Sequence, residues 1–94
     1  YLGIEGESIL EATASAHDLP TGAYVRTVYA QAPAYQAGMR VADIITKIDD
    51  SIVGGMTDVY NILLQHNSGD KVICTVMRKS GDKYITKKLK VKLQ

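Results

Sequence analysis

The sequence lacks several residue types on which common classes of functional site depend. Its 94 residues include one cysteine, Cys74, and neither tryptophan nor phenylalanine. A single cysteine excludes an intramolecular disulfide scaffold. No CxxC spacing is present, and the two histidines, His17 and His66, stand far apart, so a zinc site would have too few donors. We therefore expect no metal and no other cofactor.

Long apolar runs and a large net charge are also missing. No segment resembles a transmembrane helix, which needs about 20 apolar residues. The length fits a single domain over residues 1–94, because domains usually contain about 100 to 150 residues. Eleven basic and ten acidic side chains leave a net charge of +1. The charge is nevertheless divided: residues 1–70 carry 3 basic and 9 acidic side chains (−6), and residues 71–94 carry 8 and 1 (+7).

Sequence motifs of catalytic sites are absent as well. There is no G-x-S-x-G, no Walker sequence and no G-x-G-x-x-G. The adjacent Asp49 and Asp50 are interpreted as turn residues and not as an acid–base pair. Cys74 lies in an apolar strand and is predicted to be a small buried hydrophobic residue, and His66 is predicted to lie at a helix end, where it favours the helix dipole. The chain as given is therefore predicted to be non-catalytic.

The first half of the chain predicts short strands and short helices. Residues 5–7 are predicted to form a short, glycine-softened strand or turn, and so weak a strand would suit a sheet edge. Ser8, with Glu11 three residues later, gives a capping-box pattern for a helix over residues 8–19. The remaining predicted elements are a strand over 23–30, helical turns that begin at Pro33 and end at Gly38, a strand over 41–48 and a two-residue strand at 52–53.

The strongest helix is predicted over residues 57–66, with Thr57 as its N-cap and Gly69 in the stop signal. Its apolar residues cover about 200° of the circumference, which is wider than the roughly 100° stripe that a helix needs to pack on a core. These residues are Val59, Tyr60, Ile62, Leu63 and Leu64. Part of this arc is therefore available for a second surface.

The C-terminal charge is explained by one strand of a predicted hairpin. Strands over 71–78 and 84–93 flank a turn with glycine at its tip. In the second strand Leu89, Val91 and Leu93 alternate with lysines, so one face is apolar and the other solvated. Because no aromatic residues are interleaved with these lysines, we expect no nucleic-acid partner.

A weak edge strand, a glycine turn and a broad apolar helix are the components of peptide recognition by strand addition. Tyr1-Leu2-Gly3-Ile4 resembles the carboxylate-binding loop of PDZ domains in the HtrA (Deg) family of trypsin-like serine proteases. Residues 32–39 resemble that family's S-P-A-x-x-A-G-[LIM] segment, and residues 43–49 its G-D-x-I-x-x-[IV]-[ND]-G pattern. The order of the motifs is that of the permuted bacterial type. Ala42 and Asp50 depart from the pattern, each standing where the family has glycine.

The resemblance implies an α+β fold, a PDZ-like small, partly open β-barrel or sandwich of five to six strands capped by two helices. It also implies that backbone N–H groups of the first loop receive a terminal carboxylate, and that the helix forms a pocket for an apolar last side chain. The candidate peptide-binding residues are Tyr1, Leu2, Gly3, Ile4, Glu5, Gly6, Val59, Ile62, Leu63 and His66.

The same resemblance implies a biological setting. The parent chain would be a serine endopeptidase of the bacterial cell envelope that could form a homo-oligomer. Its protease domain would be regulated by this domain or would receive substrates from it. Partners would be C-terminal peptides of misfolded or substrate proteins. Two alternatives stay open: a PDZ domain of another bacterial peptidase or secretion component, and a binder of nucleic acid or an anionic surface. The second would use the C-terminal lysines, namely Lys83, Lys87, Lys88, Lys90 and Lys92.

Overall fold

The computed structural model describes residues 1–9, 14–16 and 19–94 of the chain. A short helical stretch covers residues 14–16. The other elements, in chain order, are β1 (Ile4–Ile9), β2 (Gly22–Val28), α2 (Pro33–Gln36), β3 (Ile44–Ile48), β4 (Ser51–Ile52), α3 (Met56–Leu64), β5 (Lys71–Ser80) and β6 (Lys83–Lys92).

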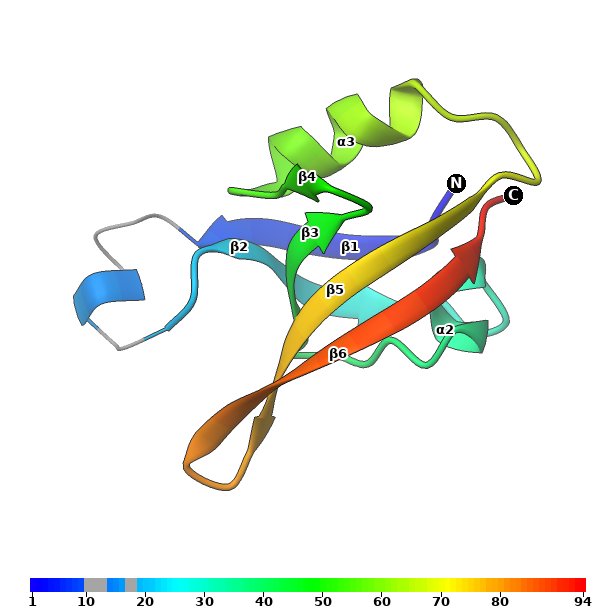
Figure 1. Ribbon diagram of the computed structural model, residues 1–94. Helices are drawn as coiled ribbons and strands as arrows, with labels where there is room; N and C mark the ends of the chain where they lie inside the picture. Colours follow the sequence, from blue (N-terminus) through cyan, green and yellow to red (C-terminus); the bar gives the residue numbers. More distant parts are fainter. Residues whose placement is uncertain (10–13, 17–18) are drawn as a thin grey trace.

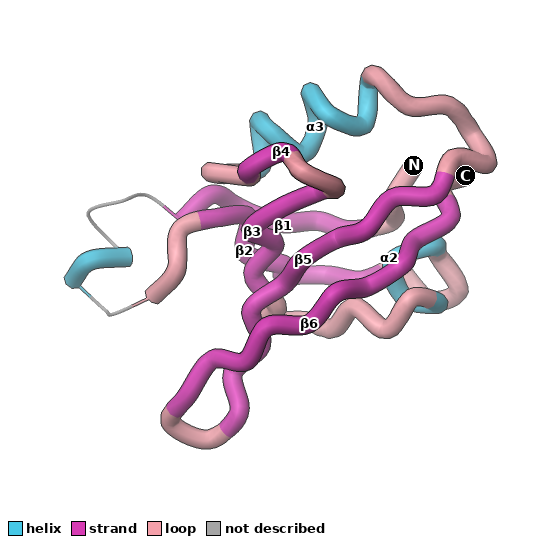
Figure 2. The backbone as a smooth tube through the Cα atoms, viewed as in Figure 1, coloured by secondary structure: helices cyan, strands magenta, loops and turns pink. Residues whose placement is uncertain are grey.

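The strands form one antiparallel sheet in the order β1-β2-β3-β5-β6, with β4 paired to β3. Within the described residues β1 and β6 are the two edges, so the sheet is not closed (Figure 1). Helix α3 lies over β1, and α2 packs near β6 (Figure 2). This arrangement confirms the predicted α+β class, the incompletely closed sheet and the edge position of the first strand.

The alternation in β6 sorts its side chains as predicted. Val91 and Leu93 are buried, whereas Lys90 and Lys92 are exposed. The positive C-terminal segment is thus largely the solvated face of one strand. Beneath it, the central core residues on β3, α3 and β5 are Ile45, Ile48, Val59, Val72, Cys74 and Val76.

The N-terminus of α3 donates a hydrogen bond to a side chain on a distant strand. The prediction that Ser8 caps a helix of its own is wrong, because Ser8 lies in β1 and its Oγ accepts a hydrogen bond of 2.9 Å from the Met56 N–H. Gly55 is the N-cap residue of α3, so the assignment of Thr57 to that position is wrong as well. A Cβ on Gly55 would lie only 2.4 Å from Ser8 Oγ, and glycine therefore permits this contact.

Other element boundaries also differ from the predictions. The expected helix over 8–19 is helical at 14–16, while residues 10–13 and 17–18, which include His17, lie outside the described residues. Strand β3 begins at Ile44 and not at position 41, because Ala42 has a φ of +76° and turns the chain just before it. Strand β4 comprises Ser51–Ile52, one residue earlier than predicted.

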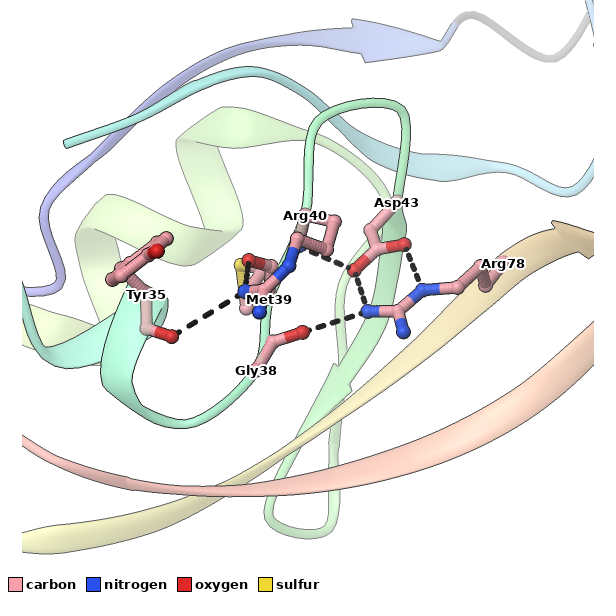
Figure 3. Close-up of polar contacts among 6 residues, drawn as sticks. All are labelled: Tyr35, Gly38, Met39, Arg40, Asp43 and Arg78. Atoms are coloured by element: carbon pink, nitrogen blue, oxygen red, sulfur yellow. Dashed lines mark hydrogen bonds and ion pairs between the residues drawn. The ribbon is translucent and has the colours of Figure 1, made fainter. Parts of the chain in front are cut away.

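A buried ion pair ties the turn before β3 to β5 (Figure 3). Asp43 is 1% exposed, and its two carboxylate oxygens accept hydrogen bonds from Arg78 Nε (2.8 Å) and Nη2 (2.7 Å). The same Nη2 donates to the Gly38 carbonyl, and the Arg40 N–H donates to the carboxylate. The hydrogen bonds to Asp43 raise the pKa of Arg78. The carboxylate is therefore both neutralised and fully hydrogen-bonded.

The two ends of the chain lie side by side (Figure 1). The Gln94 N–H donates a hydrogen bond of 3.3 Å to the Tyr1 carbonyl, at the start of the first loop. At the opposite side of the molecule, the β5–β6 hairpin projects from the body and turns at Gly81, which has a φ of +63°.

Candidate functional site

A groove of about 390 Å³ runs between the first loop and β1 on one side and α3 on the other. Its lining is predominantly apolar, which is typical of sites that receive an apolar side chain. The lining residues are Tyr1, Leu2, Gly3, Ile4, Met56, Val59, Tyr60, Leu63 and Leu64.

The loop at one end of this groove is held by its carbonyl groups. Leu2 O accepts a hydrogen bond from the Ala34 N–H (3.0 Å), and Gly3 O accepts one from the Tyr29 N–H (2.9 Å). No described residue accepts a hydrogen bond from the N–H of Leu2 or Gly3. The body of the domain thus fixes the orientation of the loop and leaves two backbone donors without a protein acceptor among the described residues.

Glycine is required at position 3 of this loop. Gly3 has a φ of +85°, in the region that side-chain-bearing residues rarely adopt. A Cβ there would lie 2.2 Å from the Cβ of Ala32, in the segment before α2. Any larger residue would move the loop and, with it, the N–H groups of positions 2 and 3.

The helical wall of the groove combines anchored and exposed residues. Val59 is buried in the core and Leu63 is half-buried, so both fix α3 against the sheet. Tyr60 and Leu64 are 57% and 82% exposed, although both are large and apolar. The expectation that the broad apolar arc of this helix exceeds the needs of the core is therefore correct.

Helix α3 approaches β1 closely at Gly6. A Cβ on Gly6 would lie 2.5 Å from the Tyr24 carbonyl oxygen and 2.9 Å from Met56 Sδ. Glycine at this position therefore allows the start of the helix to rest on the edge strand, where Met56 also lines the groove.

Six of the ten candidate residues line the groove: Tyr1, Leu2, Gly3, Ile4, Val59 and Leu63. Glu5 and Gly6 continue along β1 beside it. The other two lie elsewhere: Ile62 packs against the core, and His66 forms a 2.9 Å hydrogen bond through Nδ1 with the Ile62 carbonyl. His66 Nε2 also lies 3.9 Å from Asp49 Oδ2.

Sequence reasoning missed three groove residues, Met56, Tyr60 and Leu64. They follow one another at intervals of four, which places them on one helix face, and this spacing is the signal that could have identified them. Met56 was overlooked because the helix was expected to start after it.

Other reactive groups do not form a second site of this kind. Burial raises the pKa of the Cys74 thiol to about 12, which keeps it protonated and unreactive. No group of three or more potential metal ligands occurs among the residues that the structure describes. Likewise, no helix within the described ranges is long and apolar enough to cross a membrane.

A larger hollow of about 700 Å³ lies on the outer face of β3, β5 and β6. Lysine and aspartate side chains contribute to its lining together with threonines, so its surface is mixed in charge and polarity. Its lining residues are Thr46, Lys47, Asp49, Asp50, Ile73, Thr75, Met77, Thr86 and Lys88. The smaller groove is the stronger candidate, because it combines an apolar lining with the loop whose Leu2 and Gly3 N–H groups have no acceptor within the described residues.

This combination of an edge strand, a donor loop and an apolar helix face is that of a strand-addition module. The family model described as "PDZ domain" matches residues 1–93, and the chain belongs to this family. As a PDZ domain it is a non-catalytic module.

The curated relatives confirm the resemblance to HtrA-family PDZ domains. The chain is 40% identical over 57 residues to the Serine protease Do-like HtrA of Lactococcus lactis subsp. cremoris (strain MG1363), a match that covers 61% of this chain and 14% of the relative. It is 35% identical over 65 residues to the Serine protease Do-like HtrA of Lactobacillus helveticus, covering 69% and 16%. The chain therefore spans only a small part of these relatives.

Solved structures share the fold. The HtrA-type protease AlgW with decapeptide matches with a TM-score of 0.75 and 24% identity, over 100% of this chain and 29% of that one. The HtrA3 PDZ domain bound to a phage-derived ligand (FGRWV) matches with a TM-score of 0.76 and 18% identity, over 98% and 82%.

Proposed function

We propose that this domain binds the C-terminal end of a partner polypeptide by adding it as a strand between β1 and α3. The observation that carries the proposal is a pair of N–H groups, on Leu2 and Gly3, that have no acceptor among the described residues and lie at one end of an apolar groove beside an edge strand. Amides that converge in a tight loop form an anion site suited to a carboxylate. The last side chain of the peptide would enter the groove between Ile4 and Leu63.

The expected affinity is modest. Burying one apolar side chain contributes about 1.5–3 kcal/mol, and hydrogen bonds to a charged group contribute roughly 1.5–3 kcal/mol each. Association costs at least several kcal/mol. The balance corresponds to a Kd on the order of micromolar, which suits a module that samples chain ends and releases them.

A pair of peptides tests the carboxylate mechanism. Both have the same sequence ending in Val, one with a free C-terminus and one with an amide, and binding to the 94-residue chain is measured by calorimetry. We expect the amide to bind about 10- to 150-fold more weakly, the equivalent of one lost charge-assisted hydrogen bond. Equal affinities would refute capture of the carboxylate.

We further propose that the domain regulates, or supplies substrates to, a serine protease domain in the same parent chain. The support is that the curated relatives are Do-like HtrA serine proteases of which this chain matches a small part. The substrates would be misfolded proteins with exposed C-termini, and the parent would act in the bacterial cell envelope. Cleavage of an unfolded protein by the full-length parent should fall when the groove is blocked by Leu64→Glu. It should not fall with Ile52→Glu, which alters a residue that is equally exposed but lies outside the groove lining.

A further inference from the structure

The edge strand β1 carries two acidic side chains on the face turned away from the core. Ile4 packs against the core and Gly6 against Met56, whereas the intervening Glu5 and the following Glu7 are exposed. The register between β1 and β2 shifts between Glu5 and Gly6, but the extra residue, Arg26, lies on β2, so the alternation along β1 is kept.

These two carboxylates are not neutralised within the described part of the chain. Neither Glu5 nor Glu7 lies within ion-pair distance of a described basic group, and the exposed Arg26 on β2 forms no ion pair with either. Glu5 accepts a hydrogen bond from the Tyr29 hydroxyl, which raises the pKa of Tyr29. This contact with a neutral phenol orients the Glu5 carboxylate and leaves its charge unpaired.

Strand addition fixes which residues of a bound peptide would meet these charges. An antiparallel peptide whose carboxylate lies at the N–H groups of Leu2 and Gly3 has its last residue opposite Ile4, with the side chain toward the groove. Successive residues alternate in face, and directly opposite residues share a face. The penultimate residue then lies opposite Glu5, and the fourth from the end lies opposite Glu7.

We propose that Glu5 and Glu7 make the groove selective for C-termini with Lys or Arg at the penultimate and fourth-from-last positions. This inference rests on the proposed strand addition and further specifies the charge of the bound peptide. A cross-strand pair of opposite charges is worth roughly 0.2–1 kcal/mol, and directly opposed like charges are unfavourable. We therefore expect about a 1.4- to fivefold effect on Kd at each position, and a smaller effect in high salt.

The test uses four free-acid peptides that share an apolar last residue. They carry Lys or Glu at the penultimate position in combination with Lys or Glu at the fourth from the end. Calorimetry at low and high salt measures each Kd for the wild-type chain. The variants Glu5→Gln and Glu7→Gln remove one charge each with little change in shape, and Asp82→Asn removes one charge in the β5–β6 turn, at the far side of the molecule from the groove (Figure 1).

The expected result is position-specific. Glu5→Gln should abolish only the preference for Lys at the penultimate position. Glu7→Gln should abolish only the preference for Lys at the fourth position from the end. Asp82→Asn should leave both preferences unchanged. If all four peptides bind the wild type equally, or if Asp82→Asn weakens the preference as much as the β1 variants do, the selectivity is refuted while the groove stands. If no peptide binds, strand addition itself is refuted, and this inference with it.

Discussion

The Asp43–Arg78 cluster and the Tyr1–Ile4 loop use their polar groups in opposite ways. In the cluster, a carboxylate that is 1% exposed is met by both nitrogens of a guanidinium fork and by a backbone N–H. In the loop, the carbonyl groups are bound by the body of the domain, while the N–H groups of Leu2 and Gly3 have no acceptor among the described residues. The same chain therefore satisfies polar groups where it needs rigidity and leaves donors available where a partner can use them.

The largest effect is expected from breaking the ion pair between Asp43 and Arg78. Arg78→Ala leaves the Asp43 carboxylate buried without its counterion, and removing one partner of a buried pair costs about 3–5 kcal/mol. Urea unfolding monitored by circular dichroism measures the loss in the free energy of unfolding. Arg78→Lys serves as the control, with an intermediate loss, because it keeps the charge and loses the two-pronged geometry. A loss below about 1 kcal/mol for Arg78→Ala would contradict this account of the cluster.

The next largest effect is expected on peptide binding in the groove beside the Tyr1–Ile4 loop. Leu64 is 82% exposed and lines the groove, so Leu64→Glu should weaken binding of a Val-terminated peptide by more than about tenfold, as expected for losing one apolar contact. The free energy of unfolding should barely change, because the side chain contributes little to the core. Ile52→Glu is the matched control, since Ile52 is 75% exposed and lies outside the groove lining. Equal losses of peptide affinity in both variants would argue against the groove as the binding site.

Cys74 provides a third kind of group, one that burial holds in its neutral form. Its pKa rises from 9.0 to about 12, so the native state keeps a proton that the unfolded state loses above pH 9. Stability should therefore fall as the pH rises between these values, by up to about 1.4 kcal/mol per pH unit from this thiol. Urea unfolding from pH 8 to 11 should show a steeper decline for the wild type than for Cys74→Ala. Parallel declines would show that the thiol does not contribute.

The smallest expected effect is a gain in the free energy of unfolding. Ala42 has a φ of +76°, which costs a residue with a Cβ about 1 kcal/mol or more, and Ala42→Gly should stabilise the turn beside Asp43 by about 1 kcal/mol. Ala37→Gly is the control of opposite sign, because Ala37 has a φ of −77° and glycine gains nothing there. Thermal unfolding measures both variants, and a destabilised Ala42→Gly would contradict the assignment of strain.

What the sequence could predict depended on how far apart the interacting residues are. The alternation of Val91 and Leu93 with lysines, and the apolar excess of α3, are local patterns and were predicted correctly. The start of α3 depends on Ser8, which lies 48 positions before Met56, and no local pattern indicates that contact. This error removed Met56 from the predicted groove.

The positions of Ile62 and His66 show the same limit. Both lie on the helix that was correctly identified, but which of its apolar residues face the groove depends on how α3 rests on β1. That packing is set by the contact of Met56 with Gly6, 50 positions apart in the chain. Helical periodicity alone does not show how α3 is rotated about its own axis relative to β1.

The hydrogen bond between Gln94 and Tyr1 has a consequence for mechanics. Because Tyr1 and Gln94 lie next to each other, a force that pulls them apart would act first on this hydrogen bond and on the Tyr1–Ile4 loop. We therefore expect a bound peptide to dissociate at a lower pulling force than the one that unfolds the sheet.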